Sequence, residues 1–225
     1  MIAPLLRRAA RARLAVSAAL LAALLGAPAA TVAHAAPVPV APPPPAVLAA
    51  PAAPAAVHPA AACPVVEDRL YAAAVRDVDL RRITPEPAWR TDCRQLYRAD
   101  RRAPSVIFEE GFRPWDTVNG QYDLYSYTQV NQPSPYVSTT YDHDLYKYWW
   151  SVGWNYYIDA PGGIDINGTI GDDHRWADQV EVAFPGGVDH SFVAGGCPVD
   201  PRLRIEIMSQ CVDNPHYEPW RTRAG

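Results

Sequence analysis

Two kinds of pattern are missing from this sequence: those that usually bind a metal ion and those that cross a membrane. Its four cysteines and six histidines form no Cys-x-x-Cys pair and no His-x-x-x-His pair, the spacings typical of zinc ligands. The apolar run Leu14–Leu25 has 12 residues, whereas a membrane-spanning helix needs about 20. We therefore expect no bound metal and no membrane span.

The apolar run instead belongs to an N-terminal leader. Four arginines precede it (Arg7, Arg8, Arg11 and Arg13), and Ala33-His34-Ala35 follows it as an A-x-A cleavage site. This order is typical of a secretory signal peptide. Residues 1–35 are thus predicted to be cleaved off near Ala35, which makes the protein secreted and extracellular. The Arg7-Arg8 pair leaves twin-arginine export open, but the residues after it favour general secretion.

Charged side chains are absent from residues 36–62, which consist almost entirely of alanine, proline and valine. Proline restricts the backbone and removes hydrogen-bond donors, so this composition favours extended chain and builds no core. We interpret the segment as a disordered linker; a wall-spanning or partner-binding proline-rich segment is the alternative. Residues 63–225 are long enough for one domain with a core of its own.

Positive charge is also scarce in the exported part. Without the four leader arginines, 16 basic residues remain against 24 acidic ones, a net charge near −8. Proteins that bind long nucleic acids through the phosphates are generally basic. An acidic chain is therefore expected to meet nucleic acid at a single base with little backbone contact, or to act on another target.

All four cysteines follow the leader, and an even number in an exported chain indicates disulfides. Three pairings are possible. We favour the local ones, Cys63–Cys93 and Cys197–Cys211. The first would tie the N-terminal segment to an early strand, and the second would close a C-terminal hairpin.

Short apolar runs between turn-forming residues predict short strands and few helices. The expected helices are 67–80, 106–110 and 145–151, and the expected strands are 95–100, 136–139, 154–158, 179–184, 192–194 and 203–207. Residues 113–134 and 167–177 are polar and without a period, so we expect loops there. The pattern indicates an α+β domain with a β-sandwich core and a few short helices.

Three motifs carry side chains that suit a single ligand. Arg98 lies in the predicted strand 95–100, Ser138-Thr139-Thr140 ends the next, and Gln179-Val180-Glu181 opens the strand 179–184. Because side chains alternate along a strand, Gln179 and Glu181 would share a face. A cation, two hydroxyls, an amide and a carboxylate suit a ligand with a pyrophosphate and a sugar that passes through a cationic transition state. NAD losing nicotinamide is such a ligand.

These motifs resemble the R–STS–(Q/E)xE signature of mono-ADP-ribosyltransferase toxins, with Thr140 in place of the last serine. The run 97–104, followed by Ile107-Phe108 and Gly111-Phe112, is similar to the pertussis-toxin catalytic subunit. Trp176, three residues before Gln179, narrows the resemblance to the pierisin and scabin group, which modifies guanine in DNA. The resemblance covers roughly residues 63–217 and implies the ADP-ribosyltransferase fold.

The resemblance also implies roles for individual residues. The expected catalytic residues are Arg98, Ser138, Gln179 and Glu181; the expected NAD-binding residues are Arg98, Asp100, Arg101, Ser138, Thr139 and Trp149. Glu181 would accept a hydrogen bond from the 2′-hydroxyl of the nicotinamide ribose and stabilise positive charge at C1′. Trp149 is chosen over Trp150 and Trp154 to cover the nicotinamide and phosphates.

A guanine base would be bound by Trp176, Gln179 and Asn131. Trp176 would stack on the base, and the amide of Gln179 matches the N2 amine and N3 of guanine. Asn131, beside Val130, would line the edge of the pocket. A glutamine at position 179 argues against arginine as the acceptor, since a guanidinium would favour glutamate.

The predicted function is therefore a secreted mono-ADP-ribosyltransferase, a toxin that transfers ADP-ribose from NAD to the exocyclic amine of guanine. The acceptor would be DNA, a nucleoside or a nucleotide; the protein would act as a monomer, with NAD as substrate and without a metal. Three alternatives remain: the same fold modifying an asparagine-type protein side chain, an NAD glycohydrolase, and a non-enzymatic secreted binding module.

Overall fold

The computed structural model describes residues 63–149 and 152–222. The predicted signal peptide (1–35) and linker (36–62) lie outside the described residues, as does the end of the predicted helix 145–151. The described strands form an antiparallel sheet in the order β4-β5-β2-β1-β3-β6-β7, with β8 beside β6. The strands are β1 (Leu96–Asp100), β2 (Tyr136–Thr140), β3 (Trp154–Ile158), β4 (Ile164–Asp165), β5 (Glu181–Pro185), β6 (Val193–Asp200), β7 (Ile205–Glu206) and β8 (Val212–Asp213).

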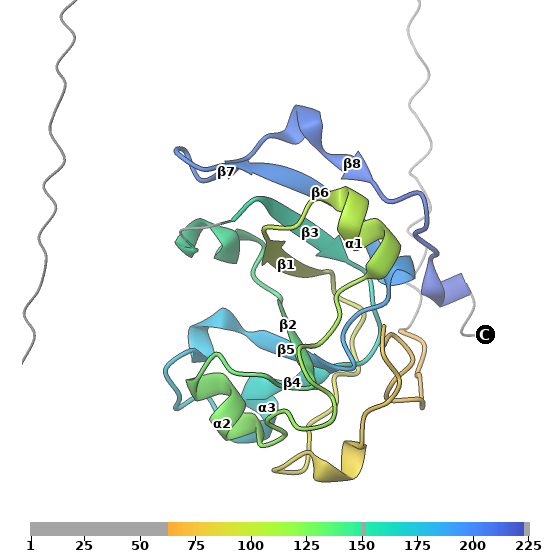
Figure 1. Ribbon diagram of the computed structural model, residues 1–225, viewed down its shortest axis with the longest axis vertical. Helices are drawn as coiled ribbons and strands as arrows, with labels where there is room; N and C mark the ends of the chain where they lie inside the picture. The colour runs from red at the N-terminus through yellow and green to blue at the C-terminus, as the bar shows by residue number, and fades with distance from the viewer. Residues whose placement is uncertain (1–62, 150–151, 223–225) are drawn as a thin grey trace, which may run out of the picture. The chain divides into compact units, whose positions relative to one another are not determined.

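The sheet is nearly divided between its two middle strands. β1 pairs with β3 along its whole length, and β2 pairs with β5 in the same way. By contrast, β1 and β2 are paired only at Tyr97 and Thr140. Figure 1 shows the result: β2, β4 and β5 form one group of strands, and β1, β3 and β6 form another.

The strands pack around two hydrophobic cores, and the larger one contains residues from both groups of strands. The larger core includes Leu96, Tyr156 and Phe112 and receives the helix α1 (Pro104–Glu110). The smaller includes Leu124 and Ile164 and receives α2 (Leu124–Gln129) and α3 (Ile166–Ile170). The 3₁₀ helices are η1 (Leu80–Arg82), η2 (His143–Tyr148), η3 (Ala177–Gln179), η4 (His190–Phe192), η5 (Met208–Gln210) and η6 (Trp220–Thr222). This architecture confirms the predicted α+β fold with a few short helices.

The helix predicted for residues 67–80 is wrong. The segment consists of turns that lead into η1, because its backbone bonds to another part of the fold. The amide of Val75 donates to the carbonyl of Gly186 (2.9 Å), and the carbonyl of Ala72 accepts from Asp189 (2.8 Å). These long-range bonds outweigh the local helical pattern.

The two predicted loops are also wrong in part, since each contains a short helix. The side chain of Asp123 accepts from the amide of Ser126 and caps α2, and Asp165 accepts from Gly168 and caps α3. Conversely, the helix predicted for 145–151 is the 3₁₀ helix η2, capped by Asp142. The strand predicted for 203–207 is present as the shorter β7, and β8 was not predicted.

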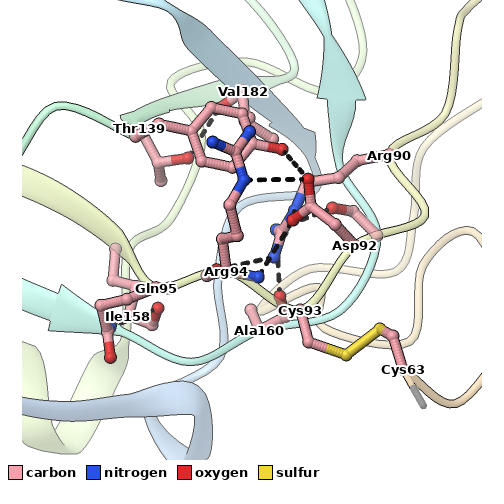
Figure 2. Close-up of polar contacts among 12 residues, drawn as sticks. Cys63, Arg90, Asp92, Cys93, Arg94, Gln95, Thr139, Ile158, Ala160 and Val182 are labelled. Carbon is pink, nitrogen blue, oxygen red and sulfur yellow. Dashed lines mark hydrogen bonds and ion pairs between the residues drawn. A yellow bond between two sulfur atoms is a disulfide. The ribbon is translucent and has the colours of Figure 1, made fainter. Parts of the chain in front are cut away.

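A buried arginine fastens the segment before β1 to the rest of the domain (Figure 2). The side chain of Arg90 is only 1% exposed. Its guanidinium donates to the carbonyls of Ala160 (3.1 Å), Gly162 (3.2 Å) and Arg94 (3.0 Å), and its Nε donates to Asp92 (3.0 Å). The burial of this cation is therefore offset by a nearly complete set of partners.

Asp92 accepts hydrogen bonds from three residues at this point: Arg90, Arg94 and Tyr141. Burial by itself raises the pKa of Asp92, but hydrogen bonds from Arg90, the Arg94 backbone and Tyr141, together with the charge of Arg90, lower it to about 2. Arg94 also stacks over the ring of Tyr141, 3.6 Å from its centroid. Tyr141 directly follows β2, so this cluster joins the start of β1 to the end of β2.

Two disulfides complete the fold, with the local pairing favoured from the sequence. Cys63 bonds to Cys93, and Cys197 on β6 bonds to Cys211 just before β8. The first bond fixes the described N-terminal end beside the Arg90 cluster. The second joins two neighbouring segments of the C-terminal hairpin.

Replacing Arg90 should destabilise the domain far more than replacing its neighbour Arg94. Arg90→Met leaves buried carbonyl groups without donors, which should cost at least about 2 kcal/mol. Arg94→Met removes a pair in which the arginine is 65% exposed, which should cost about 1 kcal/mol or less. Urea unfolding at pH 7 with the disulfides intact measures both. An equal loss of unfolding free energy in the two variants would show that the burial of Arg90 does not determine its contribution to stability.

Candidate active site

A pocket of about 580 Å³ opens where the sheet divides. It is lined by parts of β1, β2 and β5, by α2 and the residues after it, and by the ends of η2 and η3. Eight predicted site residues line it together: Arg98, Asn131, Ser138, Thr139, Trp149, Trp176, Gln179 and Glu181. Asp100 and Arg101 do not line it. The pocket therefore unites residues that lie up to 83 positions apart.

Arg98 bridges the two groups of strands. From β1, its Nη1 donates to the carbonyl of Ser138 on β2 (2.7 Å). Its Nε lies 3.4 Å from Asp100 Oδ2, but the geometry is not that of a hydrogen bond, and this buried nitrogen has no hydrogen-bond partner in the described structure. The side chain remains 26% exposed, so Arg98 presents positive charge to the pocket while it holds β2 in place.

Asp100 lies next to the Arg98 guanidinium but does not line the pocket. Burial raises the pKa of Asp100, but a hydrogen bond from Arg102 and the charge of Arg98 outweigh this and lower it to about 2. The carboxylate is therefore ionised at neutral pH. Its structural position fits that of a support for Arg98 rather than a direct ligand contact, and the exposed Arg101 lies outside the lining.

Glu181 is a buried carboxylate, 8% exposed, at the first position of β5. Its Oε1 accepts a hydrogen bond from the hydroxyl of Tyr127 on α2 (2.7 Å). Burial raises the pKa of Glu181, and the hydroxyls of Tyr127 and Ser138 and the charges of Arg98 and His174 act in the opposite direction. The site thus holds a carboxylate that is largely shielded from water but surrounded by hydrogen-bond donors and positive charge.

Gln179 and Glu181 both line the pocket, but not by strand alternation as predicted. Gln179 ends η3, and Val180 has φ 41°, a left-handed conformation that is strained for a β-branched residue. Two hydrogen bonds stabilise this strained backbone. Thr140 Oγ1 donates to the carbonyl of Gln179 (2.6 Å), and the amide of Tyr141 donates to the carbonyl of Val180 (3.4 Å). A backbone bend, rather than a pleat, directs both side chains toward the pocket.

The loop before η3 places Trp176 at the pocket. Asn167 donates to the carbonyl of Ala177 (2.8 Å) and lies 2.9 Å from His174 Nε2. The guanidinium of Arg175 stacks over the ring of Trp176 at 4.4 Å. Trp176 is therefore a half-buried aromatic surface with a cation on it.

The hydroxyl of Thr139 is already engaged. Its Oγ1 donates to the carbonyl of Val182 (2.8 Å), as Figure 2 shows, and the residue is 2% exposed. Thr139 therefore braces β2 against β5. Thr139 also lines the pocket, and its contact with NAD stays a prediction.

The three tryptophans near residue 150 differ in position. Trp149 is 50% exposed and lines the pocket. Trp154 packs against the larger core and stacks on Tyr156. Trp150 lies outside the described residues. Asn131 and Val130 are exposed at the pocket edge.

Sequence reasoning missed Tyr127, which touches the most buried carboxylate of the pocket. It also missed Tyr97, Tyr146 and Asn155, which form another part of the lining. The signal that was present for Tyr127 is the Asp-x-x-Ser pattern at Asp123 and Ser126, which marks a helix N-terminus. Recognising α2 would have placed Tyr127 on a helix rather than in a loop.

Within residues 63–149 and 152–222, no helix is long and apolar enough to cross a membrane. In that same part of the chain, no three His, Cys, Asp or Glu side chains are grouped as metal ligands.

Residues 96–217 match the protein family described as Scabin-like. A guanine-specific ADP-ribosyl transferase of Streptomyces coelicolor is 65% identical over 161 residues, which cover 72% of this chain and 79% of that relative. Pierisin of Pieris brassicae is 41% identical over 117 residues, 46% of this chain and 14% of pierisin. The solved structure of Scabin toxin from Streptomyces scabies in complex with NADH is 65% identical, with a TM-score of 0.71 over 72% of this chain and 99% of that one. These matches confirm the resemblance seen in the motifs.

Removing the charge of Glu181 should stabilise the fold while it impairs the site. The folded state holds a proton on Glu181 more tightly than the unfolded chain does, because burial raises its pKa; ionisation at higher pH therefore costs stability. Glu181→Gln keeps an acceptor for Tyr127 and should raise Tm at pH 7 by about 2–4 °C, the effect of about 1 kcal/mol in a domain of this size. The gain should shrink at pH 4. A lower Tm at pH 7 would contradict this reading.

Proposed function

The chain belongs to the Scabin-like family, and we propose that it is a mono-ADP-ribosyltransferase that cleaves NAD and transfers ADP-ribose to the exocyclic amine of guanine. The observation that carries the proposal is the convergence of Arg98, Ser138 and Glu181 with Gln179 and Trp176 in one pocket. The names of its relatives describe the same reaction: one is a guanine-specific ADP-ribosyl transferase, and a related toxin binds NADH.

Glu181 is the residue we assign to the chemical step. One of its oxygens is taken by Tyr127, and the other would accept from the 2′-hydroxyl of the nicotinamide ribose. As the bond between C1′ and nicotinamide breaks, nicotinamide leaves with the electron pair and positive charge develops on the ribose. A nearby carboxylate stabilises this charge more than it stabilises the substrate.

Arg98 and Ser138 prepare the pocket for this step. The exposed part of the Arg98 guanidinium would bind the NAD pyrophosphate, since Arg matches phosphate geometry well. Its hydrogen bond to the Ser138 carbonyl keeps the nucleotide site and the carboxylate site at a fixed separation. The Ser138 hydroxyl lies close enough to lower the pKa of Glu181.

Gln179 and Trp176 would select the acceptor. The Gln179 amide can accept from the N2 amine of guanine and donate to N3, and a base can stack on Trp176. The N2 nitrogen attacks C1′ from the face opposite nicotinamide, with inversion, and loses one proton; the products are ADP-ribosylguanine, nicotinamide and H⁺.

The acidic chain favours an acceptor that is met at one base. A net charge near −8 for the exported part disfavours a long phosphate-binding surface, so single guanines, exposed bases or free nucleotides fit better than long duplexes. The signal-like leader and the two disulfides support secretion. Action as a monomeric toxin is part of the same proposal.

Mass spectrometry of the reaction products tests the proposal. The purified protein is incubated with NAD and with guanosine, DNA or a protein lysate, and an added ADP-ribose is sought on each acceptor. We expect guanine to be modified. Modified protein with untouched guanine would instead show that Gln179 selects a side-chain amide, and nicotinamide release without any adduct would show a glycohydrolase.

Variants of Glu181 and Gln179 should separate the two halves of the reaction. Glu181→Ala should reduce both nicotinamide release and transfer by about 10²–10³-fold, the usual loss for a group that stabilises transition-state charge. Gln179→Ala should lose transfer to guanine while NAD hydrolysis survives. Gln210→Ala is the control, because this exposed glutamine does not line the pocket. Parallel loss in Gln179→Ala and Gln210→Ala would contradict the selection role.

A further inference from the structure

The contact between Tyr127 and Glu181 occupies one oxygen of the carboxylate that we assign to the chemical step. The phenol of Tyr127 donates to Glu181 Oε1 at 2.7 Å, from a helix 54 positions away in sequence. We propose that Tyr127 is a positioning residue: its hydroxyl fixes the orientation of the Glu181 carboxylate with respect to the substrate ribose. This inference rests on the proposed function for its consequences in the reaction.

The helix that carries Tyr127 is held rigidly. The side chain of Asp123 caps α2 through the Ser126 amide (2.7 Å) and also accepts from the hydroxyl of Thr84 (3.1 Å). The Leu124 amide donates to the Thr84 carbonyl (2.7 Å). Tyr127 itself packs against the ring of Tyr136 on β2, with centroids 4.8 Å apart. A short helix anchored at its first turn can therefore position a phenol to within hydrogen-bond tolerance.

The phenol can act only as a donor in this contact. Burial, followed by the negative charge of Glu181, raises the pKa of Tyr127 well above its ordinary value. Tyr127 is thus neutral at neutral pH, and its proton points to the carboxylate. Charge-assisted bonds of this type are short and about twice as strong as neutral ones.

Four groups face Glu181, each from a different part of the fold. They are Tyr127 from α2, Ser138 from β2, Arg98 from β1 and His174 from the loop after α3. All four favour the ionised form against the effect of burial. Tyr127 donates to a defined oxygen of Glu181, Oε1, at 2.7 Å, so it fixes how the carboxylate is turned.

The residues after Tyr127 connect this contact to the pocket rim. The chain leaves α2 at Gln129 and continues through Val130, Asn131 and Gln132, all of which line the pocket. Gln132 donates back to the Ser126 carbonyl (3.2 Å), which ties the rim to the helix. Tyr127 therefore links the catalytic carboxylate to the edge where the ligand enters.

The test compares Tyr127→Phe with Tyr122→Phe across pH 5–9. Tyr127→Phe keeps the ring and removes only the hydroxyl. Tyr122→Phe is the matched control, since Tyr122 is a neighbouring buried tyrosine whose hydroxyl bonds to the Thr117 carbonyl and which does not line the pocket. Nicotinamide release gives kcat and KM for NAD at each pH.

For Tyr127→Phe we expect kcat to fall on the order of tenfold at neutral pH, the usual effect of losing one hydrogen bond to a charged group, with KM for NAD within about twofold. The acid limb of the rate profile should move to higher pH, so the ratio of wild-type to variant rates should be larger at pH 5 than at pH 9. Tyr122→Phe should keep the wild-type profile. An unchanged kcat, or an equal loss at every pH, would overturn the proposal.

A titration independent of activity separates this inference from the proposed function. Carbon NMR of the Glu181 carboxyl, identified by its absence in Glu181→Gln, should show titration at higher pH in Tyr127→Phe than in the wild type. If that shift occurs in a protein that releases no nicotinamide, the proposed function fails and the positioning of Glu181 stands. If the titration does not move, the positioning role is wrong even in an active enzyme.

Discussion

The hydrogen bond from Arg98 to the Ser138 carbonyl is the contact on which the site depends. It spans the place where β1 and β2 are paired at one residue only. A continuous sheet would fill this space with backbone bonds; the division opens a pocket, and the arginine replaces the missing pairing with a side chain that still carries charge into it. The divided sheet and the nucleotide site thus both follow from the reduced backbone pairing between β1 and β2.

Glu181 is a buried carboxylate, and contacts from the rest of the fold offset the cost of its burial. A carboxylate that is 8% exposed is costly, and the domain offsets this cost with groups from two strands, one helix and one loop. Val180 adds backbone strain beside it. Such strain needs a rigid surrounding, which the Arg90 cluster and the disulfide at Cys93 supply at the end of β1 nearest to Tyr141.

Most residues of the pocket that carry the proposed chemistry could be predicted from the sequence. The backbone geometry that brings them together could be predicted less well. Arg98, Ser138 and Glu181 are recognisable because their types and order match a family signature. The alternation argument for Gln179 and Glu181 failed because a left-handed residue between them cannot be read from valine, which disfavours that conformation. The helix predicted at 67–80 failed because Val75 and Ala72 bond to the turn after β5. The cap at Asp123 could have placed Tyr127 on a helix, but it does not indicate the contact with Glu181, 54 positions away.

The most direct test of this account is a crystal structure of the Glu181→Gln variant with NAD and guanosine. The account predicts the pyrophosphate beside Arg98, the 2′-hydroxyl of the nicotinamide ribose within hydrogen-bond distance of residue 181, and the guanine between Trp176 and Gln179. NAD bound with its nicotinamide ribose away from residue 181, or guanosine bound outside this pocket, would contradict it.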